Sequence, residues 1–252
     1  MADNPNTRLL NNIHRLLTPQ PCLSLHVFAL DNRMLESVRR RLLWQLDVMV
    51  RQFLQGFPGV EIKDAFLCGS LASYFWKDDS DFDIWLQIKI DRRRFFIKNQ
   101  AKAEKFLNKH LKAQRDKNNR LFTIDGRILD VKISASQLKQ LHGVYSITTD
   151  RWVTVPRPDL TMGLNAAELY AATETRCAEI LQQMDSFTCS SEDDAKKITD
   201  YYDAIILRQY ESVFEYMVVK LLRYEGITVK LRDFCADRLA GFFSIQAPSQ
   251  KD

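Results

Sequence analysis

Hydrophobic positions recur along the chain with two patterns, one typical of helices and one typical of strands. The point at which the strand pattern ends divides the chain into two regions. Residues 35–53 carry apolar side chains every three or four positions, which predicts an amphipathic helix. The segments 61–68, 81–90 and 127–133 are short and rich in β-branched and aromatic residues, which predicts strands. Beyond Pro156 and Pro158 only the helical period remains. The pattern therefore predicts an α+β fold, with a mixed β-sheet flanked by helices and a C-terminal helical domain.

Weaker signals complete the expected order of elements. Asp125-Gly126 marks a tight hairpin between residues 121–124 and 127–133, because glycine supplies the positive φ that such a turn needs. Residues 23–30 fit a short strand and residues 71–75 a helical turn. The remaining helices are expected at residues 92–114, 165–184, 192–224 and 232–243. We therefore divide the chain into an N-terminal arm (1–22), a sheet-containing core (23–158) and a helical domain (159–252).

Composition supports a globular protein in a reducing compartment. The chain has 252 residues, of which 46% are hydrophobic and 27% charged, so it can bury a core. The five cysteines are scattered without a CxxC pair, which argues against a disulfide framework or a zinc knuckle. We find no apolar run of the roughly 20 residues that span a bilayer and no signal-peptide pattern. The expectation is a cytoplasmic protein without a membrane partner.

The candidate chemistry lies in one stretch, residues 68–84. Gly69-Ser70 follows a predicted strand and precedes the predicted helical turn, where backbone N–H groups could cradle a phosphate. Asp81 and Asp83 come next, two residues apart, so in a strand both carboxylates point to one face. Adjacent carboxylates repel each other unless a cation lies between them. Oxygen ligands on a rigid strand favour Mg²⁺, with substrate phosphates completing its coordination.

A third carboxylate is expected on a neighbouring strand. Asp130 lies in the strand after the hairpin, and Ile128 and Lys132 share its face. Three carboxylates in this layout are typical of two-metal phosphoryl transfer. Asp78 and Asp79 lie in the preceding loop and are better interpreted as solvated or turn-capping residues.

Together these motifs resemble the nucleotidyltransferase superfamily with the DNA polymerase β-like fold. The resemblance is closest to predicted nucleotidyltransferases of bacterial and phage genomes and covers about residues 27–156. Its further matching segments are the helix at 34–54, residues 60–64 (VEIKD), residues 143–146 (GVYS), Arg151-Trp152 and Pro156. Trp85 and Gln87 depart from the family pattern, which puts no catalytic position in doubt but could alter the pocket.

The resemblance implies a role for each motif residue. Asp81 and Asp83 would bind two Mg²⁺ or Mn²⁺ ions, and Asp130 would bind the catalytic ion and help to activate an acceptor hydroxyl. Gly69 and Ser70 would hold the triphosphate, and we add Ser73 and Lys132 as candidate nucleotide contacts. The implied reaction transfers a nucleoside monophosphate from an NTP such as ATP and releases pyrophosphate.

A strongly basic segment gives a separate argument about the acceptor. Residues 89–120 contain twelve Lys or Arg and three Asp or Glu, a local charge of +9, whereas the rest of the chain sums to −5. A candidate nucleic-acid-binding stripe follows helical spacing and comprises Arg94, Lys98, Lys102, Lys105, Lys109 and Lys112. Such a stripe could track phosphates, or it could simply be a solvated basic face.

Several functions remain open from the sequence. The acceptor could be the end of an RNA such as tRNA, or a protein hydroxyl, whereas a cationic small molecule is disfavoured by the basic surface. A catalytically silent nucleotide- or nucleic-acid-binding module on the same fold is the main alternative. An interaction protein that pairs through residues 192–224 is a third. Tyr145, Arg151 and Trp152 could pack near a nucleotide or form a structural turn.

Overall fold

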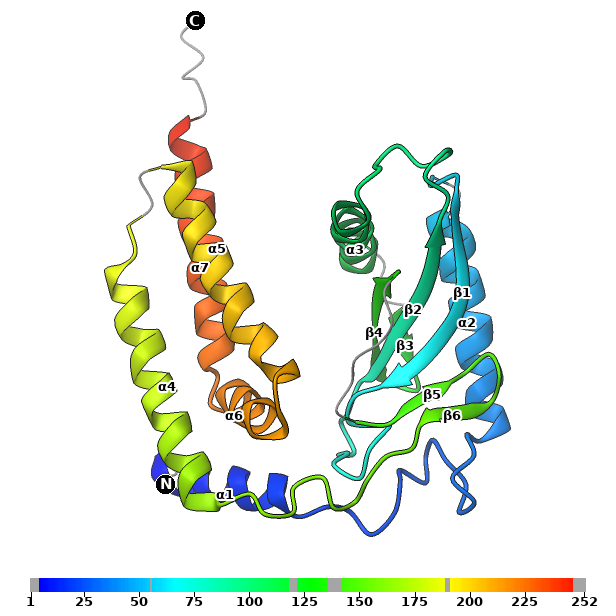
Figure 1. The fold of residues 1–252 in the computed structure, drawn as a ribbon, viewed down its shortest axis with the longest axis horizontal. Coiled ribbons are helices and arrows are strands. Elements are labelled where there is room, and N and C mark those ends of the chain that lie inside the picture. The colour runs from blue at the N-terminus through cyan, green and yellow to red at the C-terminus, as the bar shows by residue number, and fades with distance from the viewer. Residues whose placement is uncertain (1–4, 55, 118–121, 136–141, 189–190, 247–252) are drawn as a thin grey trace, which may run out of the picture. The chain divides into compact units, whose positions relative to one another are not determined.

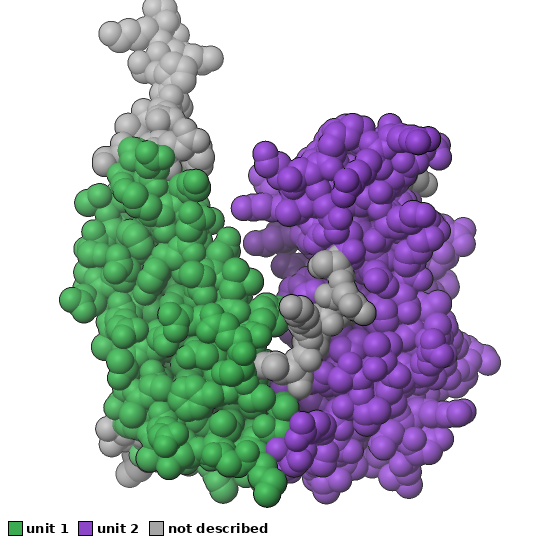
Figure 2. Space-filling model, viewed as in Figure 1, with its two compact units in different colours: residues 1–18, 160–252 green, residues 19–159 purple. Residues whose placement is uncertain are grey.

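A computed structural model describes residues 5–54, 56–117, 122–135, 142–188 and 191–246. The chain forms two compact units, coloured separately in Figure 2. The sheet unit comprises residues 19–159, and the helical unit combines residues 1–18 with residues 160–252.

The sheet unit contains six strands in the order β3-β4-β2-β1-β5-β6. Their bounds are β1 Val60–Cys68, β2 Phe82–Ile90, β3 Thr123–Ile124, β4 Arg127–Ser134, β5 Val144–Ser146 and β6 Arg151–Thr154. The sheet is mixed, because β2 and β4 are parallel whereas the other neighbours are antiparallel. The β3–β4 hairpin turns at Asp125 (φ 52°) and Gly126 (φ 77°), as the sequence predicts.

Two helices of the sheet unit, α2 (Glu36–Leu54) and α3 (Gln100–Lys117), contribute to one hydrophobic core (Figure 1). Strand β2 sends Phe82, Ile84, Leu86 and Ile88 into this core, and β4 sends Leu129, Val131 and Ile133. The alternate residues of β2 and β4 therefore point to the opposite face, which we call the open face of the sheet. Asp83 and Asp130 both lie on the open face.

The helical unit has its own core, formed by helices from both ends of the chain. Its elements are α1 Pro5–Leu17, α4 Ala166–Ser186, α5 Glu192–Leu207, η2 Arg208–Tyr210, α6 Val213–Tyr224 and α7 Ile227–Gln246. Leu9, Ile13 and Leu16 of α1 are buried with residues of α4 and α6. Arg8 and Asn12 also bind Glu225 through their side chains. Within the described residues, no helix has the length and apolarity required to cross a membrane.

The structure corrects several predicted elements. Within the predicted N-terminal arm, residues 5–17 form α1 and pack into the helical unit, so this part of the arm is an amphipathic helix with its own core contacts. Residues 23–30 form turns with one isolated bridge from Phe28 to Met34, because their amides bond locally. The predicted helix 192–224 is two helices separated at residues 208–212, where Ser212 caps α6. The predicted helix 92–114 begins only at Gln100, and the turn that precedes it is held by Asp91.

Candidate functional site

The candidate carboxylates come together where β2 and β4 begin to run side by side. Asp83 lies directly opposite Asp130 in the parallel register of these strands. Asp81 immediately precedes β2, whose first residue is Phe82. A turn fixes this approach: Ser80 accepts a hydrogen bond from Lys77 N (2.8 Å), and the Ser80 carbonyl accepts one from Arg127 Nη1 (3.2 Å). Two carboxylates from neighbouring strands therefore share the open face, with a third beside them.

Gly69 makes room for the Asp83 carboxylate. It follows β1, whose last residue, Cys68, pairs with Asp83, and it adopts a positive φ of 68°. A Cβ atom at this position would lie 2.7 Å from Cγ of Asp83 and still closer to one of its oxygens. Glycine is thus required here for both its backbone conformation and its lack of a side chain.

The loop after Gly69 differs from the predicted phosphate cradle. Residues 71–75 form turns and bends instead of a helix, so this loop supplies no helix N-terminus to the site. Ser73 is 2% exposed, and its hydroxyl donates to the Ser70 carbonyl (2.8 Å) and accepts from Phe75 N (3.0 Å). Ser73 thus serves to hold the loop, whereas Ser70 is half-buried at its start.

The ionisable groups at this site shift one another's pKa. The pKa of Asp81 is raised by burial and by the negative charges of Asp130 and Asp79. Burial also raises the pKa of the Cys68 thiol, with Asp83 raising it further and Lys132 opposing. Cys68 is therefore a protonated, structural thiol at neutral pH.

Two cations compensate Asp130. Its Oδ1 accepts a hydrogen bond from Arg115 Nη1 (3.0 Å), and its Oδ2 lies 3.4 Å from Lys132 Nζ. Lys132 shares the face of Asp130, as the sequence predicts. Arg115 comes from α3, and in the sequence it is one of the twelve basic residues of segment 89–120. No local signal at Arg115 distinguishes it, because its role depends on how α3 packs along β4.

A cavity of about 480 Å³ opens beside these groups. Its lining combines charged and apolar side chains: Asp81, Arg115, Phe122, Thr123, Ile128 and Asp130. A volume in this range and a few convergent polar groups are typical of small-molecule sites.

The donor chemistry suits a hard divalent cation, since all three candidate ligands are carboxylates. The absence of a side chain at Gly69 leaves the space that the Asp83 carboxylate occupies. Even so, within the described ranges no three His, Cys, Asp or Glu side chains are gathered closely enough to hold a metal ion. Arg115 and Lys132 instead draw the Asp130 oxygens.

The predicted basic stripe is divided by the start of α3. Arg94 and Lys98 precede the helix, and Lys98 donates to the carbonyls of Arg92 and Phe95. Four stripe residues remain on α3 and are exposed: Lys102, Lys105, Lys109 and Lys112. They lie opposite the buried face of α3, which consists of Ala103, Leu107 and Leu111.

Tyr145 and Trp152 have structural roles. Tyr145 is fully buried; its hydroxyl donates to Asp150 (2.8 Å) and accepts from Met34 N (3.2 Å). Trp152 stacks on Phe28 and donates to the Asn32 carbonyl. Arg151 is exposed in the edge strand β6.

Comparisons of the chain with protein-family models, with curated proteins and with solved structures gave no match.

Proposed function

We propose that this protein is a metal-dependent nucleotidyltransferase that transfers a nucleoside monophosphate from an NTP to an acceptor hydroxyl. The observation that carries the proposal is the register of β2 and β4, which sets Asp83 beside Asp130 with Asp81 within electrostatic reach. It is supported by the motif resemblance to the polymerase β-like superfamily and by the cavity that Asp81 and Asp130 line.

In the proposed reaction, the acceptor oxygen attacks the α-phosphorus of the NTP. A new P–O bond forms, the bond from the α-phosphorus to the bridging oxygen of the β-phosphate breaks, and pyrophosphate leaves. Asp130 takes the hydroxyl proton. Arg115 and Lys132 lie where they can attract the triphosphate. Most of the catalysis then comes from positioning and charge compensation.

Asp81, Asp83 and Asp130 are the residues that would hold Mg²⁺ or Mn²⁺. When bound, the cations would neutralise the charge that develops on the phosphoryl oxygens. Binding also requires that Asp130 share its oxygens, which Arg115 and Lys132 now attract.

The test is pyrophosphate release on Asp83→Asn, which preserves the shape of the side chain and removes its charge. We expect the rate to fall by about a thousandfold, because charge stabilisation of this kind contributes several kcal/mol. Asp78→Asn, an exposed loop carboxylate, is the matched control and should keep wild-type activity. Full activity of Asp83→Asn would refute the assignment.

The engagement of Asp130 by two cations specifically favours the alternative of a silent nucleotide-binding module. Thermal unfolding with Mg²⁺ and each of ATP, GTP, CTP and UTP separates the two functions when combined with the pyrophosphate assay. A ligand at 100 times its Kd stabilises a protein by about 2.7 kcal/mol. Stabilisation without pyrophosphate release, even with acceptors present, would indicate the silent module.

A further inference from the structure

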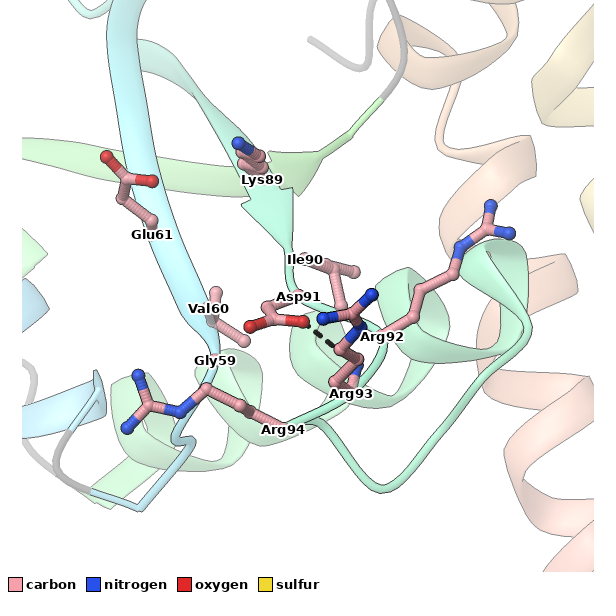
Figure 3. A pocket seen from close by; sticks show the side chains of 9 residues that line it. All are labelled: Gly59, Val60, Glu61, Lys89, Ile90, Asp91, Arg92, Arg93 and Arg94. Carbon is pink, nitrogen blue, oxygen red and sulfur yellow. Dashed lines mark hydrogen bonds between the residues drawn. The ribbon is translucent and has the colours of Figure 1, made fainter.

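A second cavity lies at the other end of β2, and cations dominate it (Figure 3). Its volume is about 560 Å³, and its lining comprises Gly59, Val60, Glu61, Lys89, Ile90, Asp91, Arg92, Arg93 and Arg94. Four of these side chains are basic and two are acidic. Asp91 is partly occupied, because it accepts a hydrogen bond from Arg93 N (2.9 Å), and Glu61 is bound by Lys63 (2.6 Å). We call this cavity the arginine pocket.

The three arginines of the pocket are exposed and available to a ligand. Among the residues that the structure describes, no carboxylate forms an ion pair with any of them. Their backbone is nevertheless ordered by local contacts: Asp91 N donates to the Gly59 carbonyl (2.7 Å), and Arg94 N donates to the Asp91 carbonyl (3.1 Å). The three guanidinium groups point in different directions from this held loop (Figure 3), so each offers its own donors, and a guanidinium can bind a phosphate in bidentate fashion.

Lys89 of the arginine pocket and Asp83 share one face of β2. Asp83, Trp85, Gln87 and Lys89 alternate along the open side of β2, while the residues between them enter the core. At about 3.3 Å per residue, Lys89 lies roughly 20 Å from Asp83. This distance is longer than a single NTP, so one nucleotide at the carboxylates would not occupy the arginine pocket as well.

An extended polyanion fits both positions. Stacked nucleotides in one strand advance about 3.4 Å each, so six of them span roughly 20 Å. The exposed ring of Phe96 (61% exposed) follows the arginines and offers a surface on which a base can stack. The four exposed lysines of α3 add positive potential within the same unit. A small phosphorylated metabolite would use none of these additional features.

We infer that the arginine pocket binds backbone phosphates of a single-stranded polynucleotide, the acceptor whose reacting end lies at the carboxylates. Its role as an acceptor rests on the proposed function, whereas the binding itself does not. Lys89, Arg92 and Arg93 thereby gain a role that the stripe at Arg94 to Lys112 did not include.

The experiment measures binding by fluorescence anisotropy, without NTP, of labelled oligouridylate of about 12 and about 4 nucleotides. The variant Arg92→Gln/Arg93→Gln is compared with Arg40→Gln/Arg51→Gln, which removes two exposed arginines of α2. We expect the pocket variant to bind the longer oligomer about tenfold more weakly. The slope of the logarithm of the binding constant against the logarithm of the salt concentration should become shallower by about 1.4, because two phosphate contacts are lost. The α2 variant should bind like the wild type.

Three outcomes would overturn the inference. Equal losses in the pocket and α2 variants would indicate only a general charge effect. Inorganic phosphate competing as well as the longer oligomer would indicate a pocket for small anions. A loss confined to Lys105→Gln/Lys109→Gln would place the nucleic acid on α3 instead. An oligodeoxyuridylate of matched length distinguishes RNA from DNA without changing the inference.

Asp83→Asn separates this inference from the proposed function. The variant should still bind the longer oligomer in a manner that depends on Arg92 and Arg93, while it loses pyrophosphate release. If the wild-type protein binds the oligomer through the arginine pocket but never transfers a nucleotide, the inference about the pocket holds and the proposed transferase function is refuted.

Discussion

The two ends of β2 carry opposite charges and are built differently. At the Asp83 end, Asp83 and Asp130 are half-buried, and Arg115 and Lys132 compensate Asp130 at 3.0 and 3.4 Å. At the Lys89 end, three arginines are exposed, and no described carboxylate forms an ion pair with them. Side chains at the acidic end therefore contribute contacts to the folded structure, whereas side chains at the basic end can be substituted with little effect on stability.

This difference determines how substitutions should act. At the acidic end, removing a group alters its neighbours, so stability and activity change together. At the basic end, the groups act on a ligand, so substitutions should change binding alone. Asp83→Asn and Arg92→Gln/Arg93→Gln test the two extremes, and three further variants at the acidic end sharpen the comparison.

The largest of these effects is expected for Gly69→Ala. The positive φ alone costs an alanine about 1–2 kcal/mol, and its Cβ would also displace the Asp83 carboxylate. We expect a lower melting temperature and a loss of pyrophosphate release. Gly126→Ala is the matched control, because it has a positive φ of 77° and no atom within 4 Å of the added Cβ. If both variants kept full activity, the space at Gly69 would not be required for the reaction, and Gly69 would serve only the backbone conformation.

A smaller effect is expected for Arg115→Gln. This change removes the charged donor to Asp130, and such hydrogen bonds contribute about 1.5–3 kcal/mol. If Arg115 positions Asp130 for the reaction, pyrophosphate release should fall about tenfold, with partial recovery in Arg115→Lys. Lys112→Gln, an exposed cation one turn earlier on α3, should have little effect. Equal rates in Arg115→Gln and the wild type would remove Arg115 from the site.

The smallest effect concerns stability at Asp81. Its pKa is raised above the ordinary 3.8 by burial, Asp130 and Asp79, so the folded protein holds this proton more tightly than the unfolded chain. Stability is therefore lost as the pH rises from about 3.8 through the raised pKa, and the penalty persists at neutral pH. In metal-free buffer at pH 7, Asp81→Asn should melt at a higher temperature than the wild type.

The same measurement below pH 4 provides the internal control for Asp81→Asn, because the difference in melting temperature should shrink there. Asp78→Asn should show no such pH-dependent gain, since Asp78 does not contribute to the shift at Asp81. A destabilised Asp81→Asn at pH 7 would mean that the carboxylate makes a favourable interaction in the folded state.

The sequence predicted those parts of the fold that have a clear period. The strands containing Asp83 and Asp130, helix α2 and the Asp125-Gly126 turn were predicted correctly, because alternation and turn chemistry are local. It failed where tertiary contacts or local capping decide the outcome. The apolar residues of 23–30 contribute to the core from turns, and α3 starts late because Asp91 and Asn99 bond the amides before and within its first turn.

The candidate site shows the same limit. Alternation along each strand predicts one face of β2 for Asp83 and one face of β4 for Asp130 and Lys132. The pairing of β2 with β4 makes these two faces continuous. Arg115 and the arginine pocket escaped prediction, because they depend on the packing of α3 and on the shape of the loop after β2. Ser73 was assigned to the nucleotide from its position in the motif, yet it is buried and holds the loop.

The packing of α1 with helices from the other end of the chain has a consequence for biosynthesis. Residues 19–159 form a complete unit that interrupts the helical unit in sequence. At about 5–20 residues per second, the ribosome needs on the order of ten to thirty seconds between α1 and the start of its partners. During that interval the sheet unit can fold, while Leu9, Ile13 and Leu16 lack their native core. The nascent chain thus exposes the apolar side chains of this amphipathic segment early, and a chaperone can bind them until synthesis is complete.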